Sequence, residues 1–238
     1  MNIVIPSCYA YRQCWEPWIA FQKHWWPECQ YKKALLSDRA FCSGGRELSL
    51  GFDRVSSWED RGFCGNLLHW CKFYTDDTFV IVMLDDHWIC GPVDDVAIIA
   101  TLESVHTTGV GCARLHPSPG PTTVLANGPF GIADPHTPYR ISTAPSIWRV
   151  SYLVKLLELL EKEKPPDKQY GFKPGTAGYF EIVGSLLSIT FPETILAASV
   201  PVIPFWNSAI VRGRWNQSAV DEARKIGVEV DTSGRPML

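Results

Sequence analysis

Two adjacent carboxylates and an imidazole follow the most apolar stretch of the sequence. Asp85, Asp86 and His87 come directly after residues 79–84, FVIVML, which read as a buried strand. Neighbouring carboxylates at such a strand end repel each other unless water, a cation or a hydrogen-bond donor offsets their charge. Mg²⁺ and Mn²⁺ prefer a few carboxylate oxygens together with water and substrate phosphates. The triplet therefore predicts either a divalent metal site or a turn with capping aspartates, and His87 is either a further metal ligand or a residue packed at the strand terminus.

A second group of polar residues follows the first apolar stretch. Residues 2–6 read as a short buried strand, and Ser7 and Tyr9 come directly after it. In open α/β sheets, ligands bind beyond the carboxyl ends of the strands. Ser7 and Tyr9 are therefore expected at the same edge of the sheet as Asp85 and Asp86.

Strand and helix patterns alternate over the first half of the chain. Apolar residues at helical spacing predict a helix that ends at Pro27. Ser57 with Asp60 three residues later reads as a variant of the capping box and predicts a helix that runs to about Tyr74. A helix over residues 93–105 and a strand over residues 110–115 follow. This alternation predicts an α/β fold with an open, mostly parallel sheet and helices on both faces.

The second half of the chain is less regular. Residues 115–138 form a proline-rich excursion with little periodicity. A helix is expected to begin at Pro145 and to present an apolar face as far as Leu160, and further helices are expected over residues 179–187 and 219–226. This half is expected to lie along one edge of the sheet, within the same single domain.

Composition sets limits on location and partners. The 238 residues, 46% hydrophobic and 20% charged, describe one globular α/β domain of ordinary size. The net charge of −3 supplies no general positive field for nucleic acid or acidic membranes. No apolar run approaches the roughly 20 residues of a membrane helix, and no basic leader precedes the first strand, so no transmembrane segment and a cytoplasmic location are expected. The eight cysteines form no CxxC pair, which indicates reduced thiols.

The acidic segment and its surroundings resemble a known family. The run TDDTFVIVMLDDHWICGPVD is similar to a region of bacterial glycosyltransferase-like proteins with the GT-A, nucleotide-diphospho-sugar transferase fold. Further fragments resemble the same family in the same order and cover most of the chain: VIPSCYAYRQCWEPWIAFQKHWWP, GFDRVSSWEDRGFCGNL, PYRISTAPSIWRVSYLVKLL, GYFEIVGS, VRGRWN and VEVDTSGRP. Because the fragments occur in the same order here as in the family, the resemblance as a whole is stronger than that of any single fragment.

The resemblance implies a nucleotide-sugar donor that lies across the strand ends. It places Asp85 and Asp86 where a Mn²⁺ or Mg²⁺ ion joins the protein to the donor diphosphate, while His87 replaces the aromatic residue that usually follows. Residues 1–115 would form the nucleotide-sugar-binding half and residues 116–238 the acceptor-side half. Besides Asp85, the residues that this resemblance assigns to the donor are Ser7, Tyr9, Asp53, Arg54, Trp58, Arg61 and Trp148.

Most of these residues also have a structural interpretation. At least one of Asp53, Arg54, Trp58 and Arg61 would be only a helix cap or a partner in a surface ion pair. Tyr9 can lie against a base or pack in the core, and Trp148 can stack on a sugar or be buried. Glu181 matches the glutamate of the family's aromatic-Glu motif and would act as the general base, and Asp86, through the metal ion, would be the other catalytic residue. A glutamate early in a helix is, however, also favourable with the helix dipole.

The resemblance implies transfer of a sugar, hexosyl or related, to a hydroxyl acceptor with help from a metal ion, as in polysaccharide biosynthesis. Two alternatives remain open. The acceptor can be a hydroxymethylated base of phage DNA, or the chain can be a non-catalytic saccharide-binding or assembly protein. Nucleotidyl transfer is disfavoured, because the segment PSCYAYR after the first strand has no glycine and one arginine.

Overall fold

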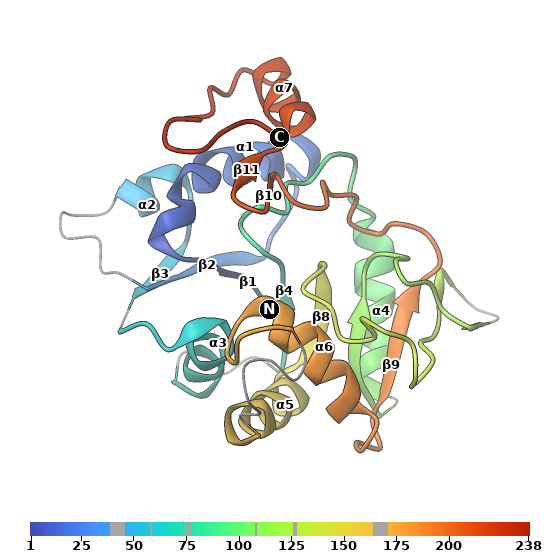
Figure 1. Cartoon of the computed structure of the whole chain (residues 1–238). Coiled ribbons are helices and arrows are strands. Elements are labelled where there is room, and N and C mark those ends of the chain that lie inside the picture. The colour runs from blue at the N-terminus through green and yellow to red at the C-terminus, as the bar shows by residue number, and fades with distance from the viewer. Residues whose placement is uncertain are drawn as a thin grey trace.

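The computed structural model describes the chain except residues 39–45, 58, 74, 76–77, 108, 126–127 and 164–170, and it is organised around one large sheet (Figure 1). The sheet has nine strands in the order β3-β2-β1-β4-β8-β5-β9-β7-β6. These strands are β1 (Asn2–Pro6), β2 (Lys32–Ser37), β3 (Arg54–Ser57), β4 (Phe79–Val82), β5 (Val110–Arg114), β6 (Thr123–Val124), β7 (Phe130–Ile132), β8 (Ser146–Arg149) and β9 (Thr194–Ala198). A separate antiparallel pair is formed by β10 (Ile210–Val211) and β11 (Arg214–Trp215).

Most strands of the sheet run in one direction. β3, β2, β1 and β4 are parallel neighbours, and β5 is parallel to β9. β8 is antiparallel to both of its neighbours, β4 and β5, and β7 is antiparallel to β9 and β6. The expected α/β domain with a mostly parallel sheet is confirmed.

The chain changes direction along the sheet between β1 and β4. From β1 it proceeds to β2 and β3 on one side, and it then returns to place β4 on the other side of β1. The loops that leave the two strands therefore diverge, which opens a crevice beyond their carboxyl ends. Ser7 and Asp85 follow these two strands.

Helices cover both faces of the sheet. One face packs against α1 (Trp15–Trp25) and α4 (Asp95–Thr107), and the same core extends to α7 (Gln217–Lys225); the other face packs against α3 (Gly62–Phe73), α5 (Val150–Lys162) and α6 (Ala177–Ser188). Shorter helices are η1 (Tyr9–Cys14) and α2 (Arg46–Leu50). Ile81 belongs to one core while Val80 and Val82 belong to the other, so β4 is buried on both faces as the FVIVML run predicts.

Two expected helix starts are wrong. Ser57 is the last residue of β3, and α3 begins only at Gly62, where the Asp60 carboxylate accepts a hydrogen bond from Gly62 N at 2.8 Å. The segment after Pro145 forms β8 before α5 begins at Val150. Because β8 lies between two strands and is covered on both faces, its buried residues carry no alternation that could distinguish them from a helix.

Other elements agree with the sequence patterns. β1, α1, α4, β5, α6 and α7 lie within a few residues of their expected bounds. β2, β3 and β9 were not expected, and the proline-rich excursion contains the short strands β6 and β7. No helix in the described ranges has both the length and the hydropathy that a bilayer-spanning segment requires.

Candidate functional site

The acid pair lies at the carboxyl end of β4 and is nearly buried. Asp85 is 5% exposed and Asp86 is 6% exposed, yet both line a cavity. The Ser7 hydroxyl donates a short hydrogen bond to Asp85 Oδ2, and Ser7 Oγ in turn accepts from Trp15 Nε1 at 2.7 Å. A chain of two hydrogen bonds thus fixes the Asp85 carboxylate relative to β1 and α1.

Burial makes both carboxylates unusually basic. Burial, and then the neighbouring Asp86, raises the pKa of Asp85 well above its usual range. Burial also raises the pKa of Asp86 to about 7, although hydrogen bonds from Ser208 and Ile210 act in the opposite direction. A positive charge placed beside the pair would relieve this cost.

The pair fits a hard divalent cation that completes its ligands from elsewhere. Within the described part of the chain, no group of three or more His, Cys, Asp or Glu side chains could hold a metal ion by itself. Mg²⁺ is often held by one or two carboxylates together with water and substrate phosphates, which is the donor set available here. Two nearly buried carboxylates that line a cavity therefore fit a cation bound jointly with a phosphorylated ligand.

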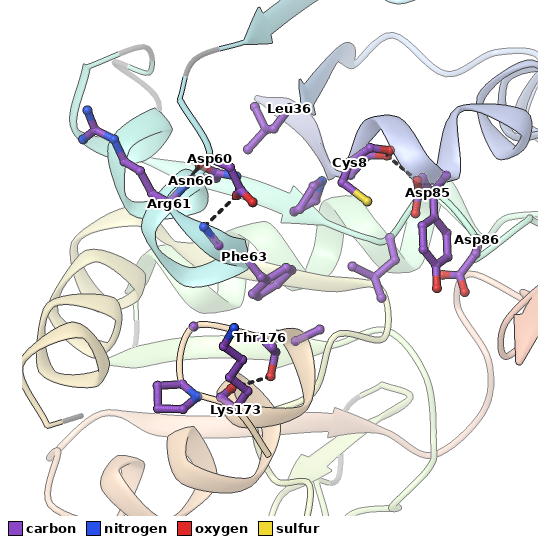
Figure 2. Close-up of a pocket in the computed structure, with 18 residues that line it drawn as sticks. Cys8, Leu36, Asp60, Arg61, Phe63, Asn66, Asp85, Asp86, Lys173 and Thr176 are labelled. Carbon is purple, nitrogen blue, oxygen red and sulfur yellow. Dashed lines mark hydrogen bonds between the residues drawn. The ribbon is translucent and has the colours of Figure 1, made fainter. Parts of the chain in front are cut away.

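The cavity beside the acid pair has a volume of about 670 Å³, within the usual range of small-molecule sites (Figure 2). It lies at the divergence of β1 and β4. Its lining comes from the ends of β1, β2 and β4, from η1, from the start of α3, and from residues 173–177 before and at the start of α6. We call this space the main cavity.

The end of the main cavity away from the acid pair is also polar. Figure 2 shows Asp60, Arg61 and Asn66 at one end and Asp85 and Asp86 at the other. Asn66 Oδ1 accepts from Arg61 N at 3.1 Å, and Asn66 Nδ2 donates to Asp60 Oδ1 at 3.3 Å. The amide and the carboxylate are therefore held in place at the start of α3.

A second cavity of about 310 Å³ contains Glu181 and His87. Glu181 Oε1 accepts hydrogen bonds from Thr143 N at 2.9 Å, from Thr143 Oγ1 at 2.8 Å and from Ser142 Oγ at 3.2 Å. His87 Nε2 lies 4.0 Å from Asp86 Oδ1. Asp86 lines the main cavity and His87, the next residue in the chain, lines the second cavity.

His87 is an uncharged residue in this arrangement. Burial, and then the nearby His116, lowers the pKa of His87 to about 3, so its contact with Asp86 is not an ion pair. Its ring packs against Phe205, with ring centroids 4.7 Å apart. His87 lines the second cavity and not the main one, and its role as a metal ligand stays a prediction.

A buried arginine shapes the wall of the second cavity. Arg114, at the end of β5, is 1% exposed and donates hydrogen bonds to the carbonyls of Pro119 and Tyr139. Pro119 and Tyr139 both line the second cavity. Arg114 therefore fixes Pro119, within the proline-rich excursion, and Tyr139, which directly follows it.

The structure brings together four of the residues expected to bind the donor or its metal ion. Ser7, Arg61, Asp85 and Asp86 line the main cavity. Three others lie outside both cavities: Tyr9, whose ring is covered by Arg12 at 4.5 Å; Asp53, which accepts from Lys33 N at 2.7 Å; and Arg54, which is exposed on β3. Trp58 falls outside the described residues.

The expectation that Trp148 contacts the donor is wrong. Trp148 lies in β8 and is 1% exposed. Its ring packs against Tyr152, with centroids 6.2 Å apart, and against Phe180 at 5.7 Å. Because core side chains occupy its surroundings, Trp148 cannot stack on a sugar.

Several residues of the main cavity were not expected from the sequence. Tyr11 enters it from η1, and Lys173 enters it from the segment before α6. The segment Lys173–Pro174–Gly175–Thr176 carried a signal, because Thr176 after a proline and a glycine is typical of a helix start. Residues 173–177 belong to the half expected to face the acceptor, so the main cavity draws on both halves.

No family model matches the sequence, and a search of curated proteins returned no relative. Solved structures that match the fold include galactosyltransferase LgtC in complex with donor and acceptor sugar analogs (8% identity, TM-score 0.47, 83% of this chain and 73% of that chain covered). A second match is the mannosyltransferase PcManGT from Pyrobaculum calidifontis in complex with GDP-Man and Mn²⁺ (11%, 0.49, 89% and 57%). A third is TarS from S. aureus (12%, 0.47, 86% and 59%). Because these TM-scores lie below 0.5, we take no activity from them.

Proposed function

We propose that this chain is a GT-A-like glycosyltransferase that moves a sugar from a nucleoside diphosphate donor to a hydroxyl acceptor with the help of Mn²⁺ or Mg²⁺. One observation carries the proposal: a nearly buried acid pair lines a cavity of about 670 Å³ at the divergence of β1 and β4. Open α/β sheets bind ligands at such a divergence. The resemblance of the sequence to glycosyltransferase-like proteins supports the same chemistry.

The main cavity provides groups for each part of a donor. Asp85 and Asp86 would hold the metal ion, and the ion would neutralise the charge that develops on the departing diphosphate. Ser7 keeps Asp85 in its orientation through the short hydrogen bond. Lys173, which also lines the cavity, would bind phosphate oxygens or the ribose. Arg61 lines the cavity with the start of its side chain, but its guanidinium turns outward and lies 3.3 Å from His69 Nδ1, so it would have to rotate to reach a donor (Figure 2). Asp60 and Asn66 would contact the nucleoside at the far end.

We assign the proton transfer to Glu181. A general base must reach the acceptor hydroxyl while the sugar carbon is attacked. The hydrogen bonds that Glu181 accepts from Ser142 and Thr143 go to Oε1, so Oε2 is the atom that would take the proton. Direct displacement with Glu181 as base would invert the anomeric carbon. The second cavity, which Glu181 lines, is the proposed acceptor site, and a saccharide hydroxyl is the proposed acceptor.

The test is donor hydrolysis with a panel of nucleotide sugars, followed by mass spectrometry. The wild-type protein is expected to release a sugar from at least one donor in Mn²⁺, and EDTA is expected to abolish the release. Glu181→Gln should lower the rate about 10²–10⁴-fold, the usual contribution of general base catalysis, while leaving the donor affinity unchanged. Glu158→Gln, on the exposed side of α5, is the matched control and should behave as wild type.

Calorimetric titration separates this proposal from its alternatives. A wild-type protein that binds no nucleotide sugar with or without Mn²⁺ would favour a non-catalytic saccharide-binding protein. Donor binding that survives in Asp85→Asn and Asp86→Asn would remove the metal site from the proposal. Salt-dependent binding to duplex DNA would favour a modified base as acceptor.

A further inference from the structure

A short segment near the C-terminal end lies against η1, at the edge of the main cavity. Arg235 Nη2 donates a hydrogen bond to the carbonyl of Ala10 at 2.5 Å, although the two residues are 225 positions apart. The Arg235 guanidinium carbon lies 4.5 Å from the centre of the Tyr11 ring. Figure 1 places the C-terminal end beside α1 and β11, in agreement with these contacts.

The segment that carries Arg235 is anchored on both sides. Asp231 Oδ1 accepts from Ser233 N at 2.9 Å, which shapes the turn before Arg235. After it, Trp215 N donates to the carbonyl of Pro236 at 2.9 Å, and Leu238 N donates to the carbonyl of Trp215 at 2.8 Å. Trp215 is fully buried. The position of Arg235 is therefore fixed by the core and not by Tyr11 alone.

Tyr11 joins Arg235 to the acid pair. Tyr11 lines the main cavity together with Asp85 and Asp86. Burial and then Asp86 raise the pKa of Tyr11, while Arg235 lowers it, so the phenol lies within the electrostatic reach of both groups. A phenol with a raised pKa keeps its proton at neutral pH and can donate a hydrogen bond to an anion.

The Arg235 side chain is partly buried, and one of its polar atoms is left unsatisfied. Arg235 Nε is shielded from solvent and has no hydrogen-bond partner in the described part of the chain. An apolar side chain could pack on Tyr11 without that desolvation cost. A cation over the ring, in contrast, fixes the ring plane and adds positive charge near the site of a diphosphate.

We propose that Arg235 is a positioning residue of the donor site, which holds Tyr11 against the main cavity so that the Tyr11 hydroxyl donates to the donor diphosphate. This inference rests on the proposed function. With Arg235 included, the donor site extends to residues 231–235. Its other parts are the lining of the main cavity, which ends at residue 177, and the residues around β10 that bind Asp86. Because Arg235 acts through Tyr11, the losses of diphosphate affinity caused by changing each residue must not add in the double variant.

The test is calorimetric titration of the full chain with Mn²⁺ and a panel of nucleoside diphosphates, UDP, GDP, ADP and CDP. Arg235→Ala is expected to weaken the best-bound diphosphate about tenfold, within the range of a cation–π contact and one hydrogen bond. Arg235→Lys should restore part of the affinity, because it keeps the cation over the ring. Tyr11→Ala should weaken binding by a similar factor, and adding Arg235→Ala to it should cause no further loss.

Two further measurements distinguish positioning from general stability. In donor hydrolysis, Arg235→Ala should raise KM and change kcat much less. Arg224→Ala, an exposed arginine on α7 that pairs with Asp221, is the matched control and should bind as wild type. Unchanged affinity in Arg235→Ala, or additive losses in the double variant, would overturn this inference alone. A wild-type protein that binds no nucleoside diphosphate would overturn the proposed function, and this inference with it.

Discussion

Asp85 and Asp86 are adjacent, but different parts of the chain hold their side chains. Ser7 binds Asp85 from the end of β1, whereas Ser208 and Ile210 bind Asp86 from the segment around β10. No lysine or arginine in the described ranges forms an ion pair with either carboxylate, and the contact of Asp86 with His87 involves an uncharged ring. The chain therefore holds two buried acids together without neutralising their charge. A bound cation would neutralise it.

The first prediction concerns the metal-free protein and its pH dependence. The pKa of Asp86 is about 7 in the folded state and about 3.9 when unfolded. Between these values the folded state binds the extra proton, so the contribution of Asp86 to the unfolding free energy falls as pH rises from about 4 to about 7. Wild type should therefore lose stability relative to Asp86→Asn over this range, by on the order of a few kcal/mol.

Urea denaturation in EDTA at pH 5 and pH 7.5 measures this difference. His87 titrates in the opposite direction, because its lowered pKa removes stability as the pH falls below about 6.5, but it is present in both proteins and cancels. A difference in unfolding free energy between wild type and Asp86→Asn that does not change with pH would contradict the raised pKa of Asp86. Asp221→Asn, on the exposed face of α7, is the matched control.

At the scale of elements, local periodicity predicted most helices and the two strands that carry the site. FVIVML is apolar at every position, so it could be assigned to a central strand, and the acids after it could be placed at the sheet edge. The segment around Trp148 could not be assigned in the same way. Ser146, Ile147 and Trp148 are all buried between β4 and β5, and the apolar pattern of α5 follows directly, so the two elements read as one helix.

The second prediction follows from the corrected position of Trp148. Trp148→Ala should destabilise the protein by about 3–5 kcal/mol, since it leaves a large cavity among Tyr152, Phe180 and their neighbours. Trp148→Phe should cost less and should leave the donor affinity unchanged, because the side chain does not reach the main cavity. Urea denaturation measures the first effect and calorimetric titration the second. A Trp148→Phe variant that is as stable as wild type but binds donor weakly would restore the stacking role.

At the scale of the whole molecule, the site is an assembly of segments that are far apart in the sequence. The main cavity is lined by residues from Pro6 to Ala177, and Arg235 packs on one of them, Tyr11. The strand ends could be predicted, because parallel strands share one edge of a sheet. The contributions of Lys173 and Arg235 could not be predicted, because they depend on how loops fold back over that edge, and loop positions leave no periodic signal in the sequence. Tyr11 lies in η1, a short helix whose direction the sequence pattern did not indicate either.

A nucleoside diphosphate bound with Mn²⁺ at the acid pair should stabilise the folded protein. A ligand that binds only the folded state stabilises it by about 2.7 kcal/mol at one hundred times its dissociation constant. For a single domain of this size each kcal/mol corresponds to about 2–4 °C in Tm. A well-bound nucleoside diphosphate with Mn²⁺ should therefore raise the Tm by about 5–10 °C.

Because the two acids hold the cation that bridges to the diphosphate, Asp85→Asn combined with Asp86→Asn should lose most of this shift, whereas Asp221→Asn should keep it. Differential scanning fluorimetry with and without EDTA measures the effect. An equal shift in EDTA would show that the diphosphate binds without the cation and that the acids serve another purpose.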